Sequence, residues 1–106
     1  MKDLGSLMKQ AQAMQQKLQE AQARFAESEI EGVSGGGVVR LTLRGTGEIA
    51  RLAIEDSLIV PGEGEIIADL VIAAHSDAKR KLDAAQSEMV RDAAGPLAGL
   101  PGMPKF

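Results

Sequence analysis

A seven-residue repeat of apolar residues runs through the first quarter of the chain. The two apolar positions of each heptad are occupied by Leu4, Leu7, Ala11, Met14, Leu18, Ala21 and Phe25. The pattern predicts a helix from about residue 3 to residue 29, about 40 Å long at a rise of ~1.5 Å per residue. A domain of 106 residues is too small to enclose such a helix. At least one end should therefore project or pair with another chain, with Leu4, Leu7, Met14 and Leu18 as the predicted dimer or partner seam.

Charged residues are sorted around the same predicted helix. Lys2, Lys9, Lys17 and Arg24 fall on one flank of the apolar seam. Glu20 and Glu27 fall on the other flank, and Asp3 is the one acidic residue on the basic side. The basic flank is typical of a contact surface for an anionic partner, but also of the solvated face of an ordinary coiled coil.

The apolar period changes to two between about residues 28 and 56. Alternation around 30–33, 38–44 and 49–55 predicts three short strands, separated by turns at 34–37 and 45–47. Short glycine-rich turns between neighbouring strands indicate an antiparallel meander. The predicted core face carries Val39, Leu41, Leu43, Ala50, Leu52 and Ile54. The opposite face carries Arg40, Thr42, Arg44 and Arg51, and is either solvated or a polar contact surface.

A second long helix is predicted from about residue 63 to residue 92. Its apolar stripe comprises Ile67, Leu70, Val71, Ala74, Ala78, Leu82, Ala85 and Met89. Lys79, Arg80 and Lys81 form the only run of three basic residues, and Arg91 projects from the same face as Arg80. The sequence thus predicts an α+β, two-layer α-β-β-β-α domain over residues 1–94 with a three-stranded antiparallel sheet and long projecting helices. Residues 95–106 are predicted to be a flexible tail rich in glycine and proline.

Composition excludes several classes of protein. The chain has no cysteine and one histidine, which excludes thiolate chemistry, zinc ribbons and iron–sulfur clusters. No apolar run approaches the length of a membrane span, and the first residues lack the apolar core of a signal peptide. We expect a soluble cytoplasmic protein without membrane contact. Its net charge of −3 excludes a strongly basic nucleic-acid binder, but not a locally basic surface.

No residue pattern indicates an enzyme. His75, Ser76 and Asp77 are consecutive on a predicted helix, so they point in different directions and cannot form a catalytic triad. The glycines at 45–47 precede a strand rather than a helix, which excludes a dinucleotide-binding turn. Glu63, Glu65 and Asp69 are better explained by the preference of acidic residues for a helix start than by a cation site. We expect no cofactor, no metal site and no small-molecule substrate.

Segments in the order of the chain resemble one known family. The opening helix LGSLMKQAQAMQ at 4–15, the hairpin EGVSGGGVV at 31–39 and the helix ADLVIAAHSDA at 68–78 are similar to the YbaB/EbfC nucleoid-associated proteins. The tail ending GMPKF at 102–106 is also similar. The resemblance implies an α-β-β-β-α homodimer whose helices project like tweezers. It also implies binding to duplex DNA and a role in nucleoid organisation or transcription.

The predicted function is therefore a homodimer that grips duplex DNA mainly through phosphates, with weak sequence preference. It would lie in the cytoplasm, associated with the nucleoid. The candidate DNA-binding residues are Lys2, Lys9, Lys17, Lys79, Arg80, Lys81 and Arg91. The alternative is an adaptor that does not bind DNA, in which Met8 and Met14 of the seam receive an amphipathic helix of a partner protein.

Overall fold

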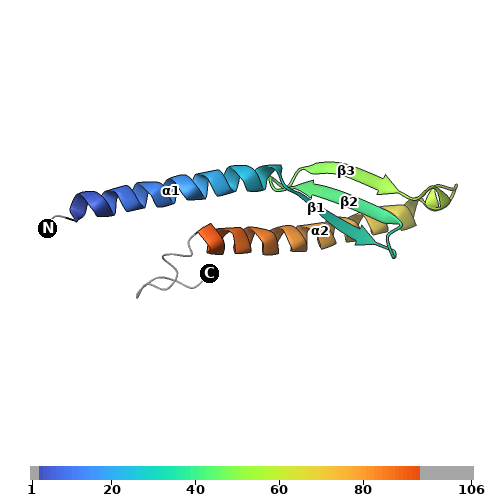
Figure 1. Cartoon of the computed structure of the whole chain (residues 1–106). Helices are drawn as coiled ribbons and strands as arrows, with labels where there is room; N and C mark the ends of the chain where they lie inside the picture. The colour runs from blue at the N-terminus through green and yellow to red at the C-terminus, as the bar shows by residue number, and fades with distance from the viewer. Residues whose placement is uncertain (1–2, 94–106) are drawn as a thin grey trace.

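Two long helices and a small sheet make up the chain, as seen in a computed structural model that describes residues 3–93. The elements follow in the order α1 (Leu4–Glu27), β1 (Glu29–Ser34), β2 (Val39–Arg44), β3 (Ile49–Ile54), the 3-10 turn η1 (Asp56–Leu58) and α2 (Gly64–Ala93) (Figure 1). The predicted α+β class and element order are confirmed, and η1 is the one added element. Lys2 and the predicted tail at 95–106 lie outside the described residues.

The three strands form one antiparallel sheet in the order β1-β2-β3. Ser34 pairs with Val39 at the first turn, where three glycines in a row adopt positive φ angles of 60°, 75° and 103°. Only glycine adopts such angles without strain, so the residues at 35–37 set this turn. In the second pair, the register shifts between Thr42 and Leu43, which indicates a bulge on β3 at the end next to its turn.

The core lies between one face of the sheet and α2. Val39, Leu41 and Leu43 of β2 are almost completely buried against α2, which contributes Ala74, Ala78 and Leu82. Small alanines on the helix let it approach the sheet closely. Gly32 of β1 is part of this contact, because a Cβ atom there would overlap the Ala74 carbonyl oxygen and the Ala78 backbone nitrogen.

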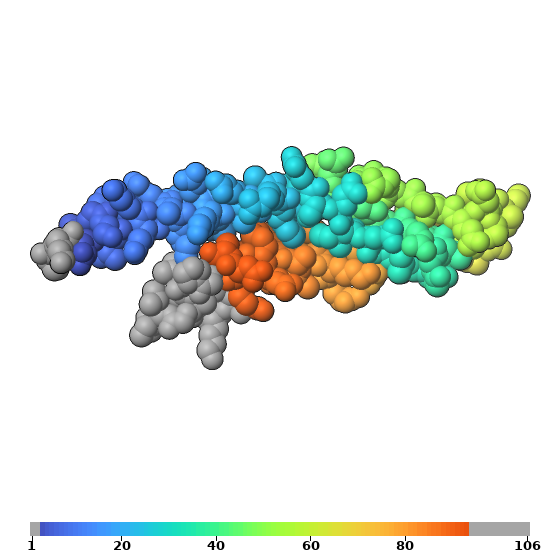
Figure 2. Space-filling view, in the orientation of Figure 1, coloured from blue at the N-terminus to red at the C-terminus, as the bar shows by residue number. Residues whose placement is uncertain are grey.

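Helix α1 differs from α2 because none of its residues is buried. Its C-terminal end is fixed to the sheet, where the Gly45 N–H donates to the Ser28 carbonyl oxygen at 3.0 Å and Gly45 lies against the Phe25 backbone. From there α1 runs beside α2 and then past its end, as the blue part of the space-filling view shows (Figure 2). The described molecule is elongated, 74 × 23 × 16 Å. The predicted projecting helix is therefore the first one.

Two details of the sheet differ from the predicted alternation. Leu52, placed on the core face, is 46% exposed, whereas its cross-strand partner Leu41 is 1% exposed. The reason is that α2 packs on β1 and β2 and leaves β3 largely uncovered. Thr42, placed on the polar face, is only 7% exposed, because it sits in the central strand between Glu31 and Arg51.

Neither helix within residues 3–93 combines the length and the hydrophobicity that crossing a bilayer requires.

Candidate nucleic-acid interface

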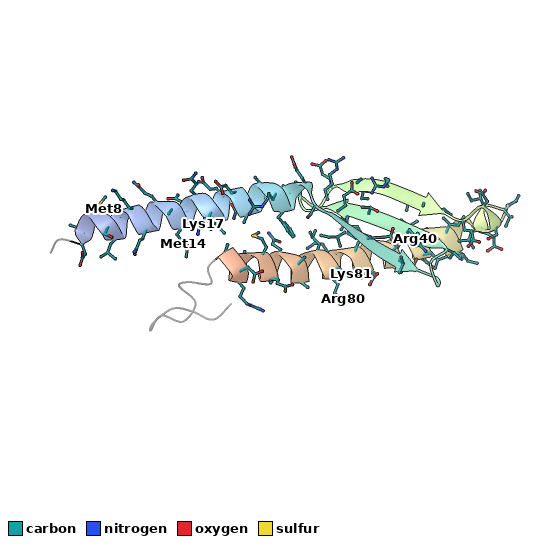
Figure 3. The ribbon with its side chains drawn as sticks, in the orientation of Figure 1. Met8, Met14, Lys17, Arg40, Arg80 and Lys81 are labelled. Atoms are coloured by element: carbon teal, nitrogen blue, oxygen red, sulfur yellow. The ribbon has the colours of Figure 1, made fainter. Side chains whose placement is uncertain are left out.

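The cations of α1 are exposed and have no acidic partner. Lys9, Lys17 and Arg24 make no ion pair with any carboxylate in the part of the chain that the structure describes. They lie on one flank of the helix, and Lys17 is seen on α1 in Figure 3. At ~1.5 Å per residue, the three positions span about 22 Å of helix axis. This arm therefore presents a short row of unneutralised positive charge.

The basic run of α2 is neutralised by neighbouring aspartates. Lys79 pairs with Asp83 at 2.5 Å, and Arg80 pairs with Asp77 at 2.6 Å. Lys81 pairs with Asp77 at 3.0 Å and also donates to the Glu31 carbonyl oxygen at 3.2 Å. Three cations thus face two carboxylates on this part of α2, near the sheet (Figure 3). Arg91, at the far end of α2, is exposed and makes no ion pair among residues 3–93.

Asp77 joins α2 to the first strand. Its Oδ2 accepts the Val33 N–H at 3.0 Å, one turn away from Ser34, whose hydroxyl donates to the Leu70 carbonyl oxygen at 2.6 Å. The hydrogen bond from Val33, followed by those from Lys81 and Arg80, lowers the pKa of Asp77 from 3.8 to about 2. Asp77 is therefore a charged latch between helix and sheet, and Lys81 belongs to it.

The outer face of the sheet also pairs its arginines. Arg40 contacts Glu31 at 3.0 Å, and Arg51 forms a bidentate pair with Glu29 that lowers the pKa of that carboxyl. Arg44 lies opposite Glu29 in the β1–β2 register but forms no ion pair within the described residues. The predicted polar contact face is thus largely balanced in charge.

A groove of about 840 Å³ separates the two helices. Apolar side chains of α1 and α2 form its floor, and charged side chains form its rim. The apolar lining includes Met14, Ala21, Phe25, Ala85 and Met89. Lys17 and Arg24 stand on the α1 side, whereas Glu88 and Asp92 stand on the α2 side. The predicted seam residues Met14 and Leu18 are half-buried beside α2, whereas Leu4 and Leu7 lie beyond it and are exposed.

A model of the YbaB/EbfC DNA-binding family matches residues 1–97. The chain belongs to this family. A nucleoid-associated protein of Phenylobacterium zucineum is 69% identical over the whole chain and 99% of its own length. A nucleoid-associated protein of Caulobacter vibrioides is 67% identical over 96% of this chain and 94% of its own. The predicted resemblance is confirmed.

The fold has a solved counterpart. The crystal structure of an uncharacterized protein from Helicobacter pylori superposes with a TM-score of 0.69 at 21% identity, covering 85% of this chain and 95% of that one. At this identity the likeness supports the α+β fold alone.

The structure separates the seven predicted DNA-binding residues into three groups. Lys9, Lys17 and Arg91 are exposed and unpaired with the described carboxylates, whereas Lys79, Arg80 and Lys81 are paired. Lys2 lies outside the described residues. Arg24 and Arg44 were not among the candidates. The sequence did carry a signal for Arg24, which shares the heptad position of Lys17, but the isolation of Arg44 depends on the ion pairs of its neighbours.

Carboxylates do not gather into a metal site in the described chain. No group of three histidine, aspartate or glutamate side chains between residues 3 and 93 is arranged to hold an ion. His75 and Ser76 are exposed on α2, while Asp77 faces β1.

A second exposed surface is apolar. β3 is an edge strand, and Leu52 beside it is open on the side that α2 leaves uncovered. Other large apolar side chains near β3, η1 and the start of α2 are about half exposed or more: Ile49, Ile59, Val60, Ile66 and Ile72. A concentration of this kind on a small domain is typical of a protein–protein interface.

Proposed function

We propose that this protein binds duplex DNA as a homodimer, mainly through phosphate contacts made by α1, with weak sequence preference. As a member of a DNA-binding family whose relatives are nucleoid-associated proteins, it would act in the cytoplasm on the nucleoid, where it would influence nucleoid organisation and transcription. The observation that carries the proposal is the contrast in charge pairing. α1 presents unpaired cations on an exposed arm, whereas the α2 run is neutralised by its own aspartates.

Phosphate binding fits isolated cations better than paired ones. A free lysine or arginine releases condensed counterions from DNA when it neutralises a phosphate. A cation that already has a carboxylate partner must first give it up, and the carboxylate then repels the phosphate. Lys9, Lys17 and Arg24 are therefore the proposed principal contacts, with Lys2 extending the same flank. Arg91, Lys79 and Arg80 are proposed secondary contacts, and Lys81 contributes less because it holds Asp77 and Glu31.

Weak sequence preference follows from the side chains that α1 offers. Its exposed polar residues are long and flexible, chiefly glutamine, lysine and arginine. Gln16, for example, hydrogen-bonds Glu20 at 3.3 Å rather than being held in a fixed direction. Selective reading of base edges requires side chains held in defined positions in the major groove. Contacts dominated by flexible cations give affinity that depends on salt rather than on sequence.

A second copy of the chain is the proposed occupant of the apolar surface beside β3. The uncovered side of Leu52 is continuous with an unpaired strand edge, which a second β3 or a second apolar surface would cover. Dimerisation also answers the acidic net charge, because two α1 arms double the local positive surface presented to one duplex.

Sedimentation velocity tests the dimer. Wild-type protein is expected at twice the chain mass of 11.1 kDa. Leu52→Asp buries a charge in the proposed interface and should shift the protein to monomer at micromolar concentration. Ala53→Asp is the matched control, because Ala53 pairs with Arg40 and faces the opposite side of the sheet. A dimer that survives Leu52→Asp would show that this surface is not the interface.

Fluorescence anisotropy of a labelled duplex across a salt series tests DNA binding. With six α1 cations in the dimer, the slope of log K against log salt should be at least about −5, since each contact contributes ~0.9. The triple variant Lys9→Gln, Lys17→Gln, Arg24→Gln should lose most of that slope. The double variant Lys79→Gln, Arg80→Gln should reduce it by less than about 2.

The outcomes separate the proposal from its alternatives. A larger loss in the α2 variant than in the α1 variant would move the contact to the basic run. A strong dependence on duplex sequence at constant salt would contradict phosphate-dominated binding. Absence of binding by the wild-type protein even at low salt would favour the adaptor reading of the seam.

A further inference from the structure

The apolar seam of α1 changes in exposure along its length. Met14, Leu18, Ala21 and Phe25 are half-buried, because α2 runs beside this part of the helix. Beyond the end of α2 the seam continues, but Leu7 is 58% exposed and Leu4 is 65% exposed. A row of apolar side chains thus begins under cover and ends without it.

The end of α2 lies at the point where cover stops. Ala93, the last residue of α2, and Met14 line the same groove between the helices. The two helices run in opposite directions, as Figure 1 shows. A chain that continues from Ala93 in the direction of α2 therefore travels along α1 toward Leu7 and Leu4.

The residues that follow α2 have an apolar period of three. Leu97, Leu100, Met103 and Phe106 recur at every third position, with prolines at 96, 101 and 104. Proline favours the polyproline II conformation, which has three residues per turn. In that conformation the four apolar side chains would share one edge of the segment. The only charged residue from 94 to 106 is Lys105.

We propose that the segment at 95–101 docks on the exposed seam of its own chain, with Leu97 and Leu100 packed against Leu7 and Leu4. The lengths agree. Leu7 and Leu4 lie about 10 and 15 Å from Met14 along the helix at ~1.5 Å per residue. Leu97 and Leu100 reach about 12 and 22 Å from Ala93 at ~3.1 Å per residue. The segment can therefore reach both leucines with length to spare for the turn at Gly95.

A second copy of α1 is a poorer occupant of this seam. Coiled-coil pairing needs three or more uninterrupted heptads. α2 already covers the seam from Met14 onward, which leaves only Leu4, Leu7 and Ala11. A short extended segment needs no more than that. It is also tethered next to the seam, which raises its effective concentration to the millimolar range without a cost in association entropy.

Docking would fix the arm that carries Lys9 and Lys17. It would leave those side chains free, because they lie on the flank rather than on the seam. The inference does not rest on DNA binding: it concerns how the arm is held, and it stands or fails separately.

Disulfide trapping tests the contact directly, because the natural chain contains no cysteine. In the variant Leu7→Cys, Leu97→Cys, mild oxidation should give an intramolecular disulfide at least tenfold faster than in the control Ser6→Cys, Leu97→Cys. Ser6 is at the same height on α1 but projects away from the seam. Equal rates in the two variants would overturn the proposal.

Mixing experiments identify the occupant. The single variants Leu7→Cys and Leu97→Cys, combined and oxidised, should give little mixed disulfide. Rapid formation of that product would mean that the tail of a second copy occupies the seam, and rapid Leu7–Leu7 cross-linking would mean a second α1. Either result overturns docking within one chain.

Hydrogen exchange provides a measurement without cysteine. Leu97→Asp, Leu100→Asp should speed amide exchange in residues 7–11 several-fold, while α2 residues 74–82 keep their protection. The control Ala98→Asp adds a charge to the same segment off the apolar edge and should leave exchange at 7–11 unchanged. Unchanged exchange in the leucine variant would contradict the proposal.

Discussion

The two helices are similar in length and composition but differ in what holds them. α2 buries Ala74, Ala78 and Leu82 against the sheet and is latched to β1 through Asp77. α1 buries no residue, and its cations are unpaired within the described chain. A helix that is fixed on both counts serves the fold. A helix that stability does not require to be basic or apolar keeps those features for a partner. The difference therefore assigns structure to α2 and binding to α1.

The sharpest way to break this comparison is to place the same substitution in both environments. Gly32→Ala puts a methyl group into the backbone of α2 at Ala74 and Ala78. Because backbone cannot move aside as a side chain can, we expect a loss of about 3 kcal/mol in the free energy of unfolding. Gly5→Ala adds the same methyl group to α1, where nothing lies within 4 Å. There we expect a change within about 0.5 kcal/mol.

Urea denaturation followed by circular dichroism measures both variants. A Gly32→Ala protein as stable as wild type would mean that β1 and α2 separate easily, and that α2 is no more fixed than α1. A large loss from Gly5→Ala would mean that the start of α1 is packed in solution.

The sequence predicts the two helices well because their periods are long and regular. Every residue of the predicted α2 stripe, from Ile67 to Met89, is at least half-buried. The α1 boundaries agree within two residues, since no other pattern competes with the heptad. Leu52 shows the limit of this reasoning. Alternation identifies the face of a strand, but it does not reveal that a single helix covers two strands of three.

The candidate site was predictable in part. Asp83 is four residues after Lys79, and Asp77 is three and four residues before Arg80 and Lys81. This spacing predicts ion pairs on one helix, so neutralisation of the basic run could have been anticipated. The bond from Val33 to Asp77 could not, because it joins residues that are 44 positions apart and depends on how β1 crosses α2.

Acid titration tests the latch that distinguishes α2, with the smallest expected effect. The pKa of Asp77 is lowered from 3.8 to about 2 in the folded chain, first by the Val33 N–H and then by Lys81 and Arg80. A lowered pKa means that the charged form stabilises the fold. This stabilisation is fully present above pH 3.8 and is lost as the pH falls through about 2.

Asp77→Asn should therefore lower the melting temperature by a few degrees at neutral pH, and the difference from wild type should shrink as the pH falls below about 3. Asp83→Asn is the control, because Asp83 makes one exposed ion pair with Lys79 and no bond to the sheet. Its melting temperature should stay close to wild type at every pH, since exposed pairs contribute little. If the two variants melted alike across the titration, Asp77 would be an ordinary surface carboxylate. The attachment of α2 to β1 would then depend on apolar packing and the close contact at Gly32 alone, and the difference between the helices would lie in burial rather than in charge.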